Sequence, residues 1–343
     1  MLTFGIGLSS QAQDLHFTQY YATPMTLNPA LTGAVNGKYR FAFQYRDQWR
    51  SVLDAPYTSF SSALDLRFPV GTSGSRLKDA FGVGIQFQTD RVSDIGFSTT
   101  QMGLFGAFHK SLNEENNQYF SAGLRLAFGQ RNVNYQNFNF ADAFDGTSGY
   151  TLGTAEQLPP NNFSFSDVSI GVNYTYAPKR QPAVFIGLAY HHITSPQLSF
   201  YFDKNEPLPE ENSPLFRKLT AHINVQIPIS SYVRITPRAN IHLQGPHMEI
   251  NAGTNLRFAL GEYGASALHV GGWVRPVTTI EDSFDLASAV AIVGFEIDNF
   301  LFGLSYDLSL SEIQNTRLGQ SIFELSVAYL GDYQSETILC PKF

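Results

Sequence analysis

Histidine has the widest chemical range of the residue types in this chain, because it can ligate metals and act as an acid or base near neutral pH. The candidates lie far apart in the sequence: His191-His192, His222, His242, His247 and His269. None has the His-x-x-x-His spacing with which a helix brings two zinc ligands to one face. We therefore predict solvated or luminal histidines and no metal site.

Two loops could hold ions. The segment Asp142-Ala143-Phe144-Asp145-Gly146-Thr147-Ser148 carries two carboxylates that could ligate calcium, but it lacks the full EF-hand pattern, which favours a polar turn. Residues 71–76 resemble a phosphate loop, yet they lack the Gly-Lys-Ser/Thr ending. No nucleophile elbow, Ser-His-Asp arrangement or paired-carboxylate cleft stands out. We predict a protein that is not an enzyme and uses no cofactor.

The elements that would position any site alternate in polarity. In Phe81-Gly82-Val83-Gly84-Ile85-Gln86-Phe87-Gln88, apolar residues occupy every second position, and 120–128, 168–176 and 300–308 repeat the pattern. A period of two predicts strands with one apolar and one polar face. Such strands build either a soluble sandwich, with the apolar faces inside, or an outer-membrane barrel, with the apolar face toward lipid.

Composition favours the barrel. Charged residues make up 15% of the chain and aromatic residues 14%, whereas a soluble domain carries about 25% charged residues. Abundant aromatics suit a lipid-facing band with interfacial girdles. The formal net charge of −7 and the absence of a Lys/Arg cluster argue against a nucleic-acid partner.

The alternating runs predict an all-β fold, a transmembrane antiparallel β-barrel of about 14 strands. The predicted strands are 38–49, 56–69, 79–90, 94–110, 117–131, 166–177, 182–193, 216–228, 231–243, 246–259, 264–275, 286–298, 299–310 and 319–331. Short connections mostly follow even-numbered strands and long ones odd-numbered strands. Since periplasmic turns are short in bacterial barrels, we expect both termini in the periplasm of a Gram-negative cell.

The chain divides into four predicted segments. Residues 1–12 resemble a signal peptide, although no Lys or Arg precedes Lys38. Residues 13–37 form an irregular periplasmic or plug segment. Residues 38–331 form the barrel, and residues 332–343 form a periplasmic tail. Phe17, Tyr20 and Tyr21 are large aromatics that need burial, for which the barrel mouth is the nearest place. Asn28-Pro29 favours a fixed turn.

With the apolar face outside, the polar face lines the lumen. Its charged residues include Arg40, Arg46, Asp65, Arg67, Arg125, Arg234, Arg238, Arg257, Asp307 and Glu324. Arginine exceeds acid in this set, which leaves two interpretations. One is an anion-selective channel or a docking surface for an acidic segment. The other, which we favour, is a ladder of paired charges that fills and stiffens the lumen.

Residues 13–33 resemble the opening of mature chains in the PorP/SprF family of the Bacteroidetes type IX secretion system. The matching residues are Gln13, Asp14, Phe17, Gln19, Tyr20, Pro24, Asn28, Pro29, Ala30 and Gly33, with Thr18 in place of the usual Ser. The resemblance continues at 45–49, 56–60 and Asp65, returns at 303–307 and 310–312, and includes the closing Cys340-Pro341-Lys342-Phe343.

This resemblance implies an outer-membrane barrel that supports export of large cell-surface proteins, often adhesins, which carry a C-terminal secretion domain. In gliding members of the phylum it implies a role in placing motility adhesins. The implied partners are outer-membrane lipid, the secretion machinery and that cargo. The opening motif is then either a plug that contacts a periplasmic partner or a structural stopper.

The mechanism we expect is docking, with 13–37 and 332–343 facing the machinery and the loops 132–165 and 194–215 facing cargo. Loops this long are usually functional or disordered. The alternative is a 14-stranded transporter of small or hydrophobic molecules of the fatty-acid transporter type, which also carries Asn-Pro-Ala near its mature N-terminus. The polar inner face disfavours a conduit for greasy substrates.

Overall fold

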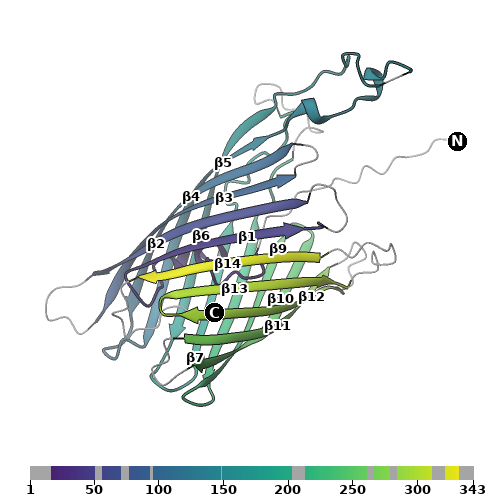
Figure 1. Ribbon diagram of the computed structural model, residues 1–343. Coiled ribbons are helices and arrows are strands. Elements are labelled where there is room, and N and C mark those ends of the chain that lie inside the picture. The colour runs from purple at the N-terminus through teal and green to yellow at the C-terminus, as the bar shows by residue number, and fades with distance from the viewer. Residues whose placement is uncertain are drawn as a thin grey trace.

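The computed structural model describes residues 17–50, 56–70, 77–92, 96–147, 149–202, 213–260, 266–278, 284–310 and 321–331. Fourteen antiparallel strands close into a single barrel, in which each strand pairs with its neighbours in sequence and β1 pairs with β14 (Figure 1). The predicted fold class and strand number are confirmed. The predicted signal peptide and the tail 332–343 lie outside the described residues.

The strands follow the predicted alternating runs closely. They are β1 (Tyr39–Gln48), β2 (Tyr57–Val70), β3 (Asp79–Val92), β4 (Phe97–Ser111), β5 (Gln118–Asn132), β6 (Asn162–Tyr176), β7 (Ala183–His191), β8 (Lys218–Pro228), β9 (Val233–Gln244), β10 (His247–Leu260), β11 (Ser266–Thr278), β12 (Phe284–Ile297), β13 (Phe300–Ser309) and β14 (Ser321–Gly331). The largest difference is β6, which begins at Asn162 rather than 166, because its first residues pair with the end of β5.

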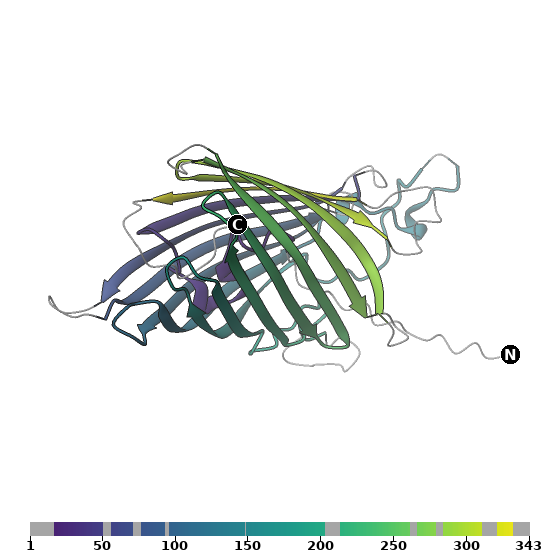
Figure 2. The same ribbon diagram turned by 90° about the horizontal axis from the view of Figure 1, so that it is seen from below.

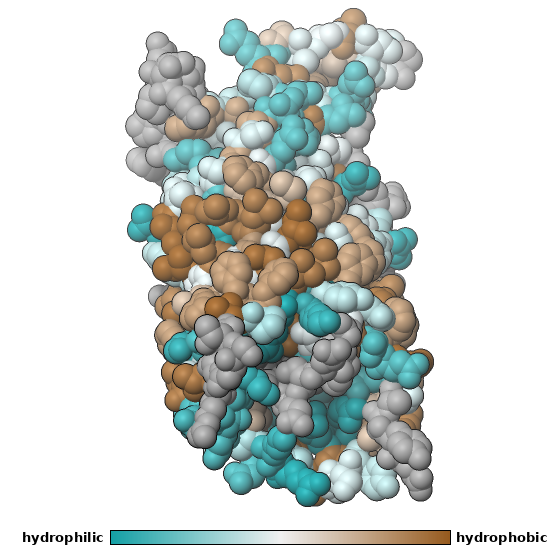
Figure 3. Space-filling model, turned by 90° about the vertical axis from the view of Figure 1, so that its left-hand side faces the viewer, coloured by the Kyte–Doolittle hydropathy of each residue, from teal (hydrophilic) through white to brown (hydrophobic). Residues whose placement is uncertain are grey.

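The two faces of the wall differ as the alternation predicts. On β5, Leu124 is 43% exposed on the outside, whereas its neighbour Arg125 is 9% exposed and points inward. Phe41 and Phe43 on β1 are exposed, and Arg40 and Gln44 beside them are buried. Apolar residues gather in a belt across the middle of the outer surface, with hydrophilic residues above and below it (Figure 3). This belt is the face that suits lipid.

The barrel has two unlike ends. The end with the connections 112–117, 177–182, 229–232 and 298–299 is called the turn end here, and the end with the connections 133–161 and 192–217 is called the loop end. Lys38 lies at the turn end, where its amide donates to the Gly331 carbonyl at 3.0 Å. The chain therefore enters its first strand and leaves its last strand on the same side of the barrel.

Helical structure is confined to short pieces. The N-terminal segment contains α1 (Pro24–Leu27) and the 3-10 turn η1 (Pro29–Leu31), and the loop after β5 contains η2 (Tyr135–Asn137) and η3 (Ala141–Ala143). Within the described ranges, none of the helices has the length and apolar character to cross a membrane. The N-terminal segment, purple in Figure 2, lies within the ring of strands.

Candidate functional site

The most distinctive site in the barrel is its occupied lumen. Residues 17–37, called the plug here, run through the lumen, and every residue from Phe17 to Val35 is buried except Thr26, which is half-buried. All seven residues of the opening motif that we predicted as a docking or plug site are buried: Phe17, Gln19, Tyr20, Pro24, Asn28, Pro29 and Ala30. None of them is on the surface, which favours the stopper over direct contact with a partner.

Glu324 on β14 anchors the start of the plug. Its carboxylate accepts hydrogen bonds from the backbone amides of Thr18 at 2.9 Å and Gln19 at 3.1 Å. The same carboxylate lies 3.4 Å from the Arg46 guanidinium, and both side chains are almost fully buried. Two backbone donors and one cation thus satisfy a charge that would otherwise be very costly inside the barrel.

The Gln19 side chain and backbone bind three strands. Its amide Nε2 donates to Ser305 Oγ at 3.1 Å, its Oε1 accepts from Ser326 Oγ at 2.6 Å, and its carbonyl accepts from Gln44 Nε2 at 2.8 Å. Gln19 is fully buried. A buried amide with this many partners fixes one orientation of the plug, because leaving any of these groups unpaired costs about 1–3 kcal/mol.

Asn28 and Pro29 make the tight turn that the sequence predicts. The Asn28 Oδ1 accepts from the Ala30 amide at 2.9 Å and so caps η1, whose first residue is the conformationally fixed Pro29. The Asn28 Nδ2 donates to the carbonyls of Val172 at 2.9 Å and Leu188 at 3.3 Å. One side chain therefore both shapes the turn and attaches it to β6 and β7.

The wall carries glycines where the plug backbone approaches. A Cβ on Gly82 would lie 2.1 Å from the Thr32 carbonyl oxygen, and a Cβ on Gly123 would lie 2.4 Å from the Pro29 carbonyl carbon. Neither distance is possible for a real side chain. These inward positions on β3 and β5 must be glycine for the plug to lie where it does.

Asp65 on β2 holds the other end of the plug. Its carboxylate accepts from the Gly33 amide at 2.7 Å and forms two hydrogen bonds with the Arg40 guanidinium, from Nε at 2.9 Å and from Nη2 at 2.7 Å. Gly33 has φ +69°, a conformation that favours glycine. The Arg67 guanidinium donates to the Val35 carbonyl at 3.3 Å.

The plug runs lengthwise through the lumen. Its start contacts Glu324, which is opposite Arg46 near the end of β1, whereas Gly33 contacts Asp65, which is opposite Arg40 near the start of β1. Phe17 therefore lies toward the loop end, and the chain returns to the turn end before β1 begins.

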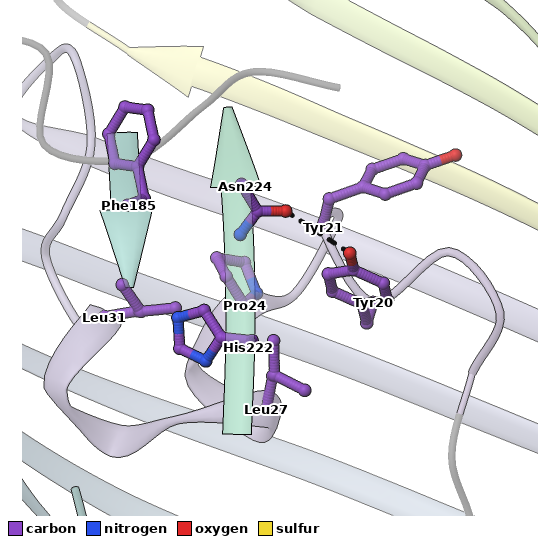
Figure 4. Close-up of a pocket in the computed structure, with 8 residues that line it drawn as sticks. All are labelled: Tyr20, Tyr21, Pro24, Leu27, Leu31, Phe185, His222 and Asn224. Carbon is purple, nitrogen blue, oxygen red and sulfur yellow. Dashed lines mark hydrogen bonds between the residues drawn. The ribbon is translucent and has the colours of Figure 1, made fainter. Parts of the chain in front are cut away.

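Aromatic side chains of the plug pack against the opposite wall. The Tyr20 ring meets the Trp273 indole edge-on with centroids 5.6 Å apart. The Tyr20 hydroxyl donates to Asn224 Oδ1 at 3.3 Å (Figure 4). The Arg238 guanidinium lies 4.7 Å from the centroid of the Tyr21 ring. A cavity lined by Tyr20, Tyr21 and Asn224, among others, has a volume of about 10 Å³. That space holds at most about one water molecule.

The predicted luminal charges lie on the inner face, and several of them pair with one another or contact the plug. Arg40–Asp65 and Arg46–Glu324 join two predicted residues each, and Arg67 and Arg238 contact the plug. Arg125, Arg257 and Asp307, by contrast, pair with residues that we did not predict. All ten predicted charged residues, including Arg234 and Arg257, occupy positions that face inward in the alternating pattern of their strands.

The missed partners are mainly acidic. Asp167 lies 3.6 Å from Arg125, Glu296 accepts from Arg257 and lies 3.1 Å from His269, and Arg275 bonds Asp307 at 2.9 Å. Each occupies an inward position of its strand, so strict alternation carried through β6, β11 and β12 would have identified it. Two further acids and one further arginine reduce the excess of arginine in this set only slightly.

Six of the described histidines form hydrogen bonds with groups of the barrel or the plug: His109, His191, His192, His222, His242 and His269. His109, a residue that the sequence did not single out, bonds the Thr32 carbonyl of the plug and Ser121 Oγ, both at 2.8 Å. His191 bonds the Leu27 carbonyl at 3.3 Å, and His192 lies 2.9 Å from Asp167. In the part of the chain that is described, no group of three or more His, Cys, Asp or Glu side chains could hold a metal ion.

The two carboxylates of the candidate calcium loop bind backbone groups of their own loop. Asp145 Oδ1 accepts from the amides of Thr147 at 2.8 Å and Gly149 at 3.0 Å. Asp142 Oδ2 accepts from the Ala155 amide at 2.6 Å and from Thr154 Oγ1 at 3.0 Å. The geometry is that of polar turns.

Several solved structures share this fold. A deletion mutant of the TodX monoaromatic hydrocarbon channel has a TM-score of 0.52 at 10% identity, with 92% of this chain and 95% of that chain covered. The CymD monoaromatic hydrocarbon channel gives 0.51 at 11% identity, covering 90% and 92%, and a FadL homologue from Pseudomonas aeruginosa gives 0.50 at 10%, covering 90% and 93%. At these identities the likeness concerns the fold alone.

No curated protein matches the chain. A family model, by contrast, matches residues 9–329, from just before the plug to near the end of β14. Its description, type IX secretion system membrane protein PorP/SprF, agrees with the opening motif, whose residues form the turn and anchors of the plug. The chain belongs to the PorP/SprF family of type IX secretion system membrane proteins.

Proposed function

We propose that this protein is a non-enzymatic outer-membrane accessory barrel of the type IX secretion system that supports export or surface display of large adhesin-like cargo by docking. The occupied lumen carries this proposal. The plug is held by Glu324, Asp65 and Asn28, and the cavity beside Tyr20 has a volume of about 10 Å³. A barrel whose lumen is filled in this way is better suited to binding partners on its outer surfaces than to letting a folded protein pass through it.

The proposal assigns different partners to the two ends. The loop end carries the connections 133–161 and 192–217, which are far longer than a hairpin needs. We assign cargo, including motility adhesins in a gliding organism, to this end. We assign the secretion machinery to the turn end, which places both termini and the tail 332–343 in the periplasm. The buried plug acts in this scheme as the stopper that keeps the barrel tight.

The alternative is a transporter of the fatty-acid transporter type. The shared fold with hydrocarbon channels and the Asn28-Pro29-Ala30 motif favour it. Against it stand the paired charges along the wall and the small luminal cavity beside Tyr20, whose volume of about 10 Å³ is far below that of an ordinary ligand pocket. Docking is therefore the function that the geometry supports best.

The test is to delete the gene and profile the secreted and surface proteins. Docking predicts the loss of one or a few large proteins from the surface, with uptake of small hydrophobic molecules unchanged. Complementation with variants that shorten 133–161 or 192–217 should leave heat-modifiable migration intact and fail to restore display. If both variants still display cargo normally, the assignment of cargo to the loop end is wrong. Lost uptake with normal display would favour the transporter.

A further inference from the structure

β6 extends beyond its neighbour β7 at the loop end. It pairs with β5 from Asn162 to Tyr176, but with β7 only from Ile170 to Tyr176. The β5–β6 pair, in teal, accordingly reaches past the other strands in Figure 1. Among the residues that the structure describes, no strand pairs with 162–169 on the β7 side. This closed barrel thus has a local open edge.

The hydrogen-bond pattern identifies the backbone groups on that edge. The Val133 amide donates to the Asn161 carbonyl at 2.9 Å, so Asn161 faces β5. Because bonded and non-bonded positions alternate along an antiparallel pair, the N–H and C=O groups of Asn162, Ser164 and Ser166 face away from β5.

Two contacts at the lower part of the edge agree with this assignment. The Ile193 amide donates to the Val168 carbonyl at 3.0 Å, and Thr194 Oγ1 donates to the Ser166 carbonyl at 3.2 Å. No contact of this kind is found for the edge-facing backbone groups of Asn162 and Ser164 among the described residues.

A pocket lies beside the open edge. It has a volume of about 400 Å³ and lies between the start of β6 and the segment 194–202. Phe163 and Phe200 form part of its lining, with ring centroids 5.0 Å apart at 83°, and Phe200 also meets Phe97 at 6.3 Å.

The far wall of the pocket is held in place by the rest of the loop end. The Leu198 amide donates to the Ser213 carbonyl at 3.0 Å, and the Leu198 carbonyl accepts from the Arg131 guanidinium at 3.2 Å. Gln197 forms a bridge with Pro214. These contacts fix the position of the far wall. The volume of the pocket lies in the range that is usual for ligand sites.

We infer that the edge Asn162–Ser166 and this pocket bind an extended segment of a second polypeptide. The segment adds a strand to β6, its backbone bonds Asn162 and Ser164, and a large apolar side chain enters the aromatic pocket. This is β-strand addition, in which backbone bonds give affinity and pockets for alternate side chains give specificity. The inference rests on the proposed function in one respect, namely that the second polypeptide is the cargo.

The chemistry of the edge selects this occupant over two others. A small hydrophobic molecule would fill the pocket but would form no backbone hydrogen bonds with the exposed edge at Asn162 and Ser164. The neighbouring sequence 203–212 of the same chain carries Pro207 and Pro209. Proline has no N–H, so this stretch is a poor partner for a strand.

Binding can be measured on the full-length protein in detergent. The probe is a fluorescein-labelled synthetic peptide of about seven residues that alternates Thr with Phe or Val, and its fluorescence anisotropy reports binding. A fully N-methylated copy keeps the side chains but has no backbone donors. We expect the N-methylated peptide to bind roughly tenfold more weakly, because a tenfold change corresponds to about 1.4 kcal/mol, which two lost hydrogen bonds can supply.

Variants of the protein test the same site from its other side. Phe200→Ala should weaken binding of the unmodified peptide, whereas Tyr201→Ala, which alters an exposed neighbour outside the pocket lining, should not. Ser164→Pro, which removes an edge donor, should also weaken it, with heat-modifiable migration as the check on folding. Phe200 lies outside the strands, so Phe200→Ala does not interrupt strand pairing. If Ser164→Pro fails to fold, Phe200→Ala still tests the site.

Three results would overturn the inference. Equal binding of the N-methylated peptide would show a purely apolar pocket. Unchanged binding to both Phe200→Ala and Ser164→Pro would place the peptide elsewhere. Binding only after 203–212 is replaced by a Gly/Ser linker would identify the chain's own segment as the occupant. The secretion profile of the deletion strain does not depend on these peptide-binding results. Failure of the proposed function can therefore be told apart from failure of this inference.

Discussion

Asn28 lies directly against the backbone of Gly171. A Cβ built on Gly171 would lie 2.0 Å from the Asn28 Oδ1, the atom that also caps the η1 turn through the Ala30 amide. Asn28 is fully buried, so its side chain cannot move away from a new atom at this position. The wall and the plug therefore fit at this point only because one partner has no side chain.

Gly171→Ala should displace Asn28 and loosen the plug. Overpacking of a tight interior costs about 1–3 kcal/mol, which guanidinium unfolding of the detergent-folded protein would measure. Limited proteolysis should cut within 17–37 faster than in the parent protein. Gly106→Ala is the matched control, because the nearest atom to its new Cβ is 3.9 Å away. Equal behaviour of the two variants would contradict the contact with Asn28.

Glu324→Ala should release the first residues of the plug. It removes the acceptor of the Thr18 and Gln19 amides and leaves the buried Arg46 without this carboxylate. Losing one partner of a buried ion pair costs about 3–5 kcal/mol. In planar bilayers we expect channel openings that the parent protein lacks. Glu156→Ala, in an exposed part of the loop 133–161, is the control. A silent Glu324→Ala barrel would show that other contacts suffice.

The lipid-facing assignment can be tested at two adjacent residues. Leu124→Arg should destabilise the folded barrel by about 2–4 kcal/mol if the site is near the bilayer midplane. Arg125→Leu should cost much less in lipid contact, although it removes a partner of Asp167 at 3.6 Å and of Gln101 at 3.1 Å. Unfolding in lipid vesicles measures both. Equal losses would contradict the inside and outside assignment on β5.

The loop 133–161 should keep its local structure down to low pH. The hydrogen bond from the Ala155 amide holds the pKa of the exposed Asp142 carboxyl below its ordinary value of 3.8. A lowered pKa means that the contribution is present above pH 3.8 and is lost as the pH falls through the lower value of the folded loop. Hydrogen exchange at Ala155 across this range measures it. Protection that already falls between pH 6 and 5 would contradict the assignment, since that range lies about one to two units above the ordinary pKa of an aspartate.

The strands were predictable because one face of each meets lipid and the other does not, which imposes a period of two. The same alternation located the luminal charges, Arg40, Asp65 and Glu324 among them. It did not tell which carboxylate meets which arginine, because Arg125 pairs with Asp167 and Arg257 with Glu296 across different strands. Such pairing depends on the register and on side-chain length.

The path of the plug was beyond the sequence pattern. Residues 17–37 have no period, and their burial was predicted from their aromatics rather than from a strand pattern. Their contacts are with wall positions far away in the chain, such as Gly171 and Glu324. The early start of β6 was missed for a related reason, because only pairing with the end of β5 makes Asn162–Phe165 a strand.

The hydrogen bond between Thr18 and Glu324 joins residues 306 positions apart. Glu324 lies on β14, the strand that also closes the ring against β1. During synthesis the plug is made first and its principal anchor last. Anchoring the start of the plug and sealing the seam between β1 and β14 thus become a single late step of assembly, and a chain that stops before β14 has neither a closed wall nor the Glu324 anchor.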